Sequence, residues 1–263
     1  MVPLGLAGRA VLVTGPAKGM GRAITLALAE AGADLLLVGR DRDAIAPVAA
    51  EAEALGRRAL VVRADVTDEP AVAAAAARAE EAFGETLYGL VNVAGVAGPS
   101  GASLWEHTVA DYRRLFDANV LGPVLTMKHL LPMLMARGRG SVVNIGGTFG
   151  FKGVRKAALY GATKWALRGL SKSAALEAAA GGVRVNMVSP GGVEGPRLTR
   201  QLGEQAARDG IGYAAAHARF CATAALGRMS TDADVADAVL FLMGDAARNI
   251  TGQDLLVDGG TIV

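Results

Sequence analysis

Tyr160 and Lys164 stand four residues apart in a stretch whose periodicity predicts a helix. Residues i and i+4 lie on one helix face, so the lysine ammonium is expected beside the tyrosine ring. A free tyrosine has a pKa of about 10, and a neighbouring positive charge stabilises the phenolate and lowers that pKa. Such a pair can exchange a proton with a carbonyl oxygen near neutral pH, although the same spacing is common on ordinary helix surfaces.

The segment Thr14-Gly15-Pro16-Ala17-Lys18-Gly19-Met20-Gly21 has the composition of a phosphate-binding loop. Gly15 permits a tight turn, while Gly19 and Gly21 let the backbone approach a pyrophosphate. The helix that follows would supply N–H donors at its N-terminus. An ordinary glycine-rich turn is the alternative, but the position after the first strand favours dinucleotide binding. The spacing is GxxxGxG, not GxGxxG.

Short apolar runs alternate with longer helical patterns along the chain. The runs predict seven strands: Ala10–Thr14, Leu35–Val38, Ala59–Val62, Leu87–Val93, Ser141–Ile145, Val183–Ser189 and Leu255–Val257. The helical patterns cover Arg22–Ala31, Asp43–Leu55, Ala71–Phe83, Asp111–Arg137, Tyr160–Ala179 and Asp232–Met243. This alternation predicts an α/β fold, a single Rossmann-type doubly wound domain over residues 1–263 with a seven-stranded parallel sheet. An irregular segment at about 195–229, after the sixth strand, is expected to form a substrate lid.

Composition narrows the functional classes. The 263 residues are 52% hydrophobic and carry a formal net charge of +2, which gives no electrostatic footprint for nucleic acid. No run is long and apolar enough to cross a membrane, so no membrane partner is expected. The single cysteine, Cys221, cannot form an internal disulfide and suggests a reducing, cytoplasmic setting. The three histidines lack metal-ligand spacing, so no metal site is predicted.

The order and spacing of the motifs resemble the short-chain dehydrogenase/reductase family over essentially the whole chain. The similarity is carried by the glycine loop, by Asn92-Val93-Ala94-Gly95 in place of the family's Asn-Asn-Ala-Gly, by Asn119, by Tyr160-Gly161-Ala162-Thr163-Lys164, by Pro190-Gly191, and by the C-terminal run from Gly252 to Gly260.

This resemblance implies roles for individual residues. Tyr160 would be the general acid/base, Lys164 would also hold the nicotinamide ribose, and Asn119 would anchor a water of the proton relay. Asn92 would stabilise the central strands and the cofactor side of the site. Further cofactor contacts are implied at Gly15, Lys18, Gly19, Met20, Gly21, Asp65, Val66, Ala94, Gly95, Pro190, Gly191 and Val193.

The end of the second strand indicates which nicotinamide cofactor is used. NAD enzymes place an acid there for the ribose 2′-hydroxyl, whereas NADP enzymes place a base for the 2′-phosphate. Arg40 occupies that position and Lys18 adds a second cation, so NADP(H) is predicted. Alternatively both cations are solvated and Asp41 turns towards the ribose. Asp65-Val66 resembles the pair that contacts adenine, or else begins a helix cap.

Two positions depart from the family pattern. Gly147 stands where the family has a serine that polarises the substrate carbonyl, and Gly195 stands where it has a threonine that binds the nicotinamide carboxamide. The missing hydroxyl can be replaced by Thr148, by a water or by a polar group of the substrate. We hypothesise Thr148, because the two glycines before it allow its side chain to turn inwards against the usual alternation of a strand.

The substrate pocket of the family borders the segment between Gly147 and Tyr160. Here that segment holds Phe149, Lys152, Arg155 and Lys156, and the lid begins with Arg197 and Arg200. These cations could attract a carboxylate, phosphate or sulfonate, or the loop could simply be solvated.

Together the sequence predicts an NADP-dependent oxidoreductase that transfers a hydride between nicotinamide and a small, possibly anionic carbonyl/alcohol substrate. The alternatives are a non-catalytic NADP-binding regulatory protein, or a dehydratase or epimerase on the same fold. By resemblance the chain would form a homotetramer or homodimer, with interfaces from the C-terminal strand and from the helices at 111–137 and 160–179.

Overall fold

A computed structural model describes residues 5–98 and 101–263, and its centre is one parallel sheet of seven strands. Their order is β3-β2-β1-β4-β5-β6-β7. The bounds are β1 (Ala10–Thr14), β2 (Asp34–Gly39), β3 (Ala59–Arg63), β4 (Leu87–Asn92), β5 (Gly140–Ile145), β6 (Val183–Pro190) and β7 (Asp254–Val257). The predicted fold class and all seven strands are confirmed, with ends shifted by a residue or two.

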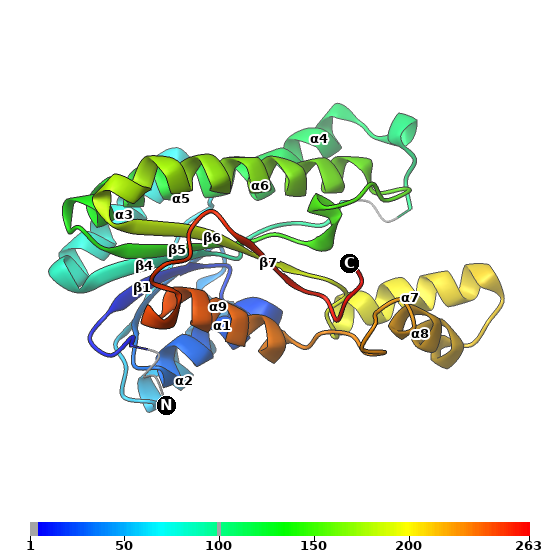
Figure 1. The fold of residues 1–263 in the computed structure, drawn as a ribbon, viewed down its shortest axis with the longest axis horizontal. Helices are drawn as coiled ribbons and strands as arrows, with labels where there is room; N and C mark the ends of the chain where they lie inside the picture. Colours follow the sequence, from blue (N-terminus) through cyan, green and yellow to red (C-terminus); the bar gives the residue numbers. More distant parts are fainter. Residues whose placement is uncertain (1–4, 99–100) are drawn as a thin grey trace.

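Helices cover both faces of the sheet (Figure 1). One face carries α1 (Gly19–Glu30), α2 (Arg42–Ala54) and α9 (Asp232–Met243), and the other carries α3 (Glu69–Phe83), α5 (Gly122–Ala136) and α6 (Ala158–Ala178). In β1, Val11 and Val13 face the first layer while Ala10 and Leu12 face the second, and all four are at most 2% exposed. A strand buried on both sides must be apolar throughout, which explains the continuous runs in the sequence.

The strand order reverses between β1 and β4, so the connections leave these two strands in opposite directions. Thr14 and Asn92 end the two strands and are paired in register. Ligands of open α/β sheets bind beyond the carboxyl ends of the strands at such a switch point. The glycine loop and the Ala94-Gly95 turn both begin there.

The single helix predicted over Asp111–Arg137 is wrong in its middle. The chain forms α4 (Val109–Phe116), then a π-helical turn (Asp117–Leu121), then α5. Pro123 has no N–H, so the carbonyl of Asn119 lacks the donor four residues on that an α-helix needs. The chain instead closes a wider turn, in which the Gly122 N–H donates to the Asp117 carbonyl.

The segment 195–229 was expected to be irregular, and the structure contradicts that expectation. It contains α7 (Pro196–Asp209) and α8 (Tyr213–Cys221), which extend past the end of the sheet in Figure 1. Leu198, Leu202 and Ala206 recur at every fourth position of α7, which is a helical period, but the helix is otherwise so polar that an irregular segment was expected from the sequence. Short 3₁₀ turns complete the described elements: Gly84–Thr86, Leu104–Glu106, Thr148–Gly150, Ala179–Gly181 and Asp245–Ala247.

Within residues 5–98 and 101–263, no helix is both long enough and apolar enough to cross a bilayer.

Candidate active site

The glycine loop is tightly folded against the turn after β4. The Gly15 N–H donates to the Val38 carbonyl over 2.9 Å, and Gly15 has a φ of 68°. A Cβ on Gly15 would lie 2.9 Å from the Ala94 Cα, and one on Gly21 would strike the Gly15 carbonyl oxygen. Both positions therefore need glycine. Gly15 has a positive φ and lies against the Ala94 backbone, whereas Gly21 needs only to lie close to the Gly15 carbonyl.

The N-terminus of α1 fits an anionic group. Its first turn contains no acidic residue, and Lys18 at the N-cap is exposed and leaves the backbone donors without a side-chain cap. The Thr14 Oγ accepts hydrogen bonds from the N–H groups of Val93 and Ala94, each 3.1 Å, which fixes the neighbouring turn. A helix N-terminus that has glycine at its first and third positions, Gly19 and Gly21, suits the phosphates of a dinucleotide.

Arg40 follows β2 and its side chain is 75% exposed, with its nearest acidic group, Asp65, 3.8 Å away. Asp41 does not compete for the same ligand, because its carboxylate accepts from the Ala44 N–H over 3.0 Å and caps α2. Asp65 accepts from the backbone and hydroxyl of Thr67. The ion pair that Arg40 forms at the end of β2 is long and exposed, and such pairs are weak, so the guanidinium can turn to a ligand at little cost.

A buried chain of hydrogen bonds crosses the middle of the sheet. The Thr126 hydroxyl donates to Asn92 (2.8 Å), Asn92 donates to Asn144 (2.9 Å), and Asn144 donates to Ser171 (2.9 Å). These side chains come from α5, β4, β5 and α6. The chain satisfies polar groups that would be costly to bury alone, and it ties the ends of two central strands to the helix that carries Tyr160.

Asn119 lies in the π-helical turn and is 3% exposed. Its amide bonds both backbone groups of Val96, at 2.8 Å and 3.0 Å, and donates to Thr163 at 3.2 Å. Thr163 in turn donates to the Tyr160 carbonyl over 2.7 Å. The side chain of Asn119 therefore holds the Val96 backbone and the start of α6 in place, and its backbone carbonyl lacks the donor that an α-helix would provide.

Tyr160 and Lys164 are placed as their spacing predicts. The ammonium lies 5.5 Å from the centre of the tyrosine ring, is mostly buried, and donates to the Ile145 carbonyl over 3.2 Å. Burial alone would raise the pKa of Tyr160, but the charges of Lys164 and Arg197, with hydrogen bonding from Arg197, lower that pKa below its usual value. The Phe149 ring packs edge-on against Tyr160, with centroids 5.5 Å apart.

Gly147 closes the site beside Lys164. A Cβ there would meet nothing nearer than 3.8 Å, where Lys164 and the Pro190 carbonyl lie, and the backbone is close to extended (φ 159°). Its N–H donates to the buried Ser189 hydroxyl over 3.2 Å. Thr148 begins the next 3₁₀ turn and is 6% exposed.

The segment 195–229 is fixed at its base. Gly191 N–H donates to the Val257 carbonyl over 3.0 Å, and Val193 forms a parallel bridge with Ser230. Arg197 then enters the site, with its guanidinium carbon 5.6 Å from the Tyr160 ring centre. Of the cations named from the sequence, Arg197 is the one whose charge acts on Tyr160, together with Lys164, and it is itself exposed. The three cations of the loop are also exposed and do not act on Tyr160: Lys152, Arg155 and Lys156.

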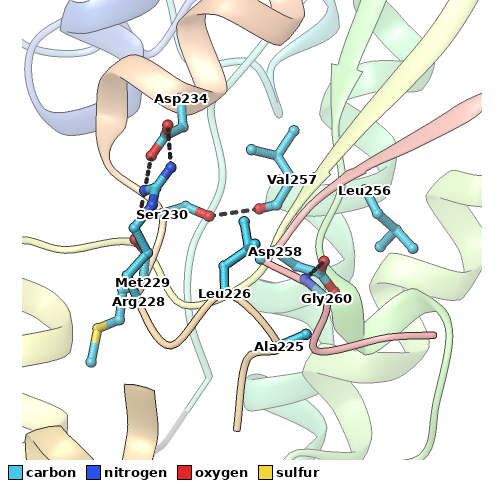
Figure 2. A pocket seen from close by; sticks show the side chains of 11 residues that line it. Ala225, Leu226, Arg228, Met229, Ser230, Asp234, Leu256, Val257, Asp258 and Gly260 are labelled. Atoms are coloured by element: carbon cyan, nitrogen blue, oxygen red, sulfur yellow. Dashed lines mark hydrogen bonds and ion pairs between the residues drawn. The ribbon is translucent and has the colours of Figure 1, made fainter. Parts of the chain in front are cut away.

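A cavity of about 400 Å³ lies where this segment returns to the sheet (Figure 2). Arg228 and Asp234 form an ion pair on one wall, at 2.8 Å, and Ser230 donates to the Val257 carbonyl over 2.9 Å. Tyr160 is not among the lining residues, so this cavity is separate from the candidate active site.

Asp234 is expected to stabilise the fold near neutral pH but not in acid. Hydrogen bonds from Arg228 and Thr231 lower its pKa well below the unfolded value of about 4. A depressed acid contributes stability above the unfolded pKa and loses it as the pH falls through the folded pKa. Asp234→Asn should therefore cost about 1 kcal/mol at pH 7 and progressively less in acid, measured by urea unfolding.

Asp232 is the matched control for that prediction. It lies two residues earlier in the same helix turn, and partial burial raises its pKa. A raised acid loses stability as the pH rises, so Asp232→Asn should be neutral or stabilising at pH 7. Equal destabilisation by both substitutions would contradict the electrostatic account.

The parallel sheet has a glycine loop at its switch point and a Tyr–Lys pair beyond it, which is the arrangement of a Rossmann-type fold with a candidate site at the carboxyl ends of its strands. The chain belongs to the short-chain dehydrogenase/reductase family: the model described as enoyl-(acyl carrier protein) reductase matches residues 15–261.

Relatives with assigned activities cover nearly the full length. The chain is 39% identical over 254 residues to cis-4-hydroxycyclohexanecarboxylate dehydrogenase of Sinomonas cyclohexanicum, covering 97% of this chain and 96% of that protein. It is 40% identical over 234 residues to a Xanthobacter autotrophicus protein described as inactive 2-(S)-hydroxypropyl-CoM dehydrogenase 2, covering 89% and 97%. The chain thus resembles dehydrogenases of hydroxyl groups.

Solved structures agree with the fold and with a nicotinamide cofactor. An NAD⁺-bound xylitol dehydrogenase matches with a TM-score of 0.91 and 29% identity, covering 97% of this chain and 99% of that one. An actinorhodin polyketide ketoreductase with NADPH matches with a TM-score of 0.89 and 30% identity, covering 96% of this chain and 97% of that one. Both cofactors therefore occur among similar folds.

Proposed function

We propose that this chain is an NADP(H)-preferring dehydrogenase that interconverts a secondary alcohol and a ketone on a small molecule with an anionic group. The observation that carries the proposal is the placement of Lys164 and Arg197 around Tyr160, which lowers the pKa of a tyrosine beyond the phosphate loop. A hydroxyl with a lowered pKa can exchange a proton with a substrate oxygen near neutral pH.

In the oxidation, the Tyr160 phenolate would accept the alcohol proton. A nicotinamide held at the glycine loop and beside Lys164 would supply the hydride-accepting chemistry that turns the alcohol carbon into a carbonyl. Lys164 stabilises the phenolate and returns the proton towards solvent through a water at the Asn119 carbonyl. Reduction follows the reverse path. Gly15, Gly19, Met20 and Gly21 would cradle the pyrophosphate, with Asp65 and Val66 beside the adenine and Ala94, Gly95, Pro190, Gly191 and Val193 along the rest of the dinucleotide.

An anionic substrate is supported by the cation at the reaction centre and by a relative that acts on a hydroxycyclohexanecarboxylate. Phe149 offers an apolar contact for the body of the substrate, and Lys152 and Arg155 add exposed positive charge at the mouth. The segment 195–229, called the lid from here on, would cover it. Thr148 stays the sequence-based candidate for the missing serine hydroxyl.

The direct test follows the absorbance of reduced nicotinamide with NADP⁺ or NAD⁺ and two alcohols, cis-4-hydroxycyclohexanecarboxylate and neutral cyclohexanol. Turnover that is faster with NADP⁺ and with the carboxylate supports the proposal. Tight cofactor binding without turnover of any secondary alcohol would favour a non-catalytic nicotinamide-binding protein. Two observations motivate this alternative: the glycine at position 147 and the relative described as inactive.

Arg40→Asp is expected to erase or reverse the preference for NADP⁺. A charge-assisted hydrogen bond to the 2′-phosphate contributes roughly 1.5–3 kcal/mol, about one to two decades of discrimination. The measurement is the ratio of kcat/KM for the two cofactors, with Arg42→Asp, an exposed cation two residues on, as control. Equal use of both cofactors by the unmodified protein would refute the NADP assignment.

A homotetramer or homodimer is also proposed. Leu176 on α6 is 82% exposed, Trp165 on the same helix is 49% exposed, and Leu255 on the edge strand β7 is 38% exposed. Apolar side chains on an open strand edge and a long helix suit burial against further copies. Light scattering in solution gives the number of copies directly.

A further inference from the structure

Arg197 is the second residue of α7, at the start of the lid, and it faces the reacting side chain rather than its own helix. Its guanidinium carbon lies 5.6 Å from the Tyr160 ring centre, almost the same distance as the Lys164 ammonium at 5.5 Å. Tyr160 thus has two cations near its ring, one from its own helix and one from a segment 37 positions further along the chain.

The position of Arg197 does not favour its own helix. A cation at a helix N-terminus meets the positive end of the helix dipole, and the first turn of α7 has no acidic residue to offset it. Among the described residues, the ion pair formed within α7 joins Arg200 to Glu204 at 3.9 Å and leaves Arg197 out. Its charge is therefore available for a negative group in the site.

Gly147 leaves the opposite wall without a donor side chain. A Cβ there would make ordinary van der Waals contact with Lys164 and the Pro190 carbonyl, each at 3.8 Å, so a small side chain fits, but glycine carries no hydroxyl. An oxygen that receives the Tyr160 proton lies within about 3 Å of the tyrosine oxygen. The Arg197 guanidinium, whose carbon lies 5.6 Å from the Tyr160 ring centre, offers five N–H donors on a long side chain that can turn towards an oxygen bound at the tyrosine hydroxyl.

We propose that Arg197 donates a hydrogen bond to the reacting oxygen of the substrate and so takes the polarising role that the family gives to a serine. This rests on the proposed function. Arg197 keeps all its protons throughout the step. It stabilises the negative charge that develops on the oxygen and holds Tyr160 in the form that accepts a proton.

Arg197→Gln tests this role. kcat should fall about 10²–10³-fold for both the carboxylate substrate and cyclohexanol, because the lost donor acts on the oxygen common to both. Gly147→Ser in the Arg197→Gln background should recover part of the loss, since it restores a hydroxyl on the other wall.

Arg208→Gln is the matched control. Arg208 is exposed, lies on the same side of α7, and is about 16 Å further along the helix axis. It should leave kcat unchanged. Either of two kinetic results would overturn the inference. If Arg197→Gln raised KM for the carboxylate and left cyclohexanol unaffected, Arg197 would be a substrate anchor only. If Thr148→Val caused a large loss of kcat and Arg197→Gln did not, the polarising role would belong to Thr148.

Titration of the Tyr160 phenolate by ultraviolet absorbance needs no substrate. The protein without cofactor is compared with its Tyr160→Phe variant, and Arg197→Gln should move the phenolate midpoint to higher pH by at least about half a unit. An unchanged midpoint would overturn the inference. A different outcome is that the unmodified protein shows no turnover while Arg197→Gln still moves the phenolate midpoint. That result would refute the proposed function but would support the effect of Arg197 on Tyr160.

Discussion

Tyr160→Phe is expected to lower kcat about 10²–10⁴-fold, because it removes the proton donor and keeps the ring that packs against Phe149. The cofactor should still bind, since the glycine loop and Lys164 are unchanged. Turnover is followed by nicotinamide absorbance and cofactor affinity by fluorescence.

Tyr112→Phe is the control for that substitution. Tyr112 is half exposed on α4, stacks on Phe116, and has no part in the site. It should retain full turnover. If Tyr160→Phe kept more than about a tenth of the kcat, Tyr160 would not be the general acid/base.

Lys164→Met is expected to lower kcat/KM about 10²-fold at neutral pH. The ammonium lowers the pKa of Tyr160, and in the oxidation direction the phenolate is the active form. Without that charge the pKa rises, so the acidic limb of the pH profile moves to higher pH. At a pH below the pKa of Tyr160, each unit by which that pKa rises lowers kcat/KM about tenfold.

Lys172→Met controls for the loss of a lysine from α6. Lys172 lies two turns further along the helix and donates to the Gly252 carbonyl at the surface. It should change neither kcat/KM nor the pH profile. A Lys164→Met enzyme whose acidic limb stays in place would show that Lys164 acts through binding alone.

The fold was predictable because its strands are buried on both faces. Strands such as β1 and β2 consist almost entirely of valine, leucine, isoleucine and alanine, and the intervening helices keep a clear apolar period. Two elements escaped prediction. The π-helical turn depends on Pro123 and on hydrogen bonds of Asn119 with a distant backbone. α7 carries a narrow apolar stripe in an otherwise polar segment, and that stripe was overlooked.

The candidate site also contains residues that could be predicted from the sequence and residues that could not. Positions fixed by local geometry, such as Gly15 and Gly21 or the Tyr160–Lys164 pair, can be identified from spacing because the constraint acts within one turn. The contact of Arg197 with Tyr160 joins two separate segments, and no local pattern distinguishes it from other surface cations. Ser189, which accepts from the Gly147 N–H, was missed because a serine within a buried strand gives no signal.

The bridge between Val193 and Ser230 also makes the lid separable from the rest of the molecule. The chain leaves the sheet and returns to it at one point, and Ser230 is bonded in turn to Val257 of β7. Once both ends are joined, the length between them matters little: doubling a flexible loop costs only about 0.6 kcal/mol in closure entropy. The lid can therefore be exchanged for that of a relative as a cassette, which would change the groups facing the substrate while the sheet keeps its proton-exchanging pair.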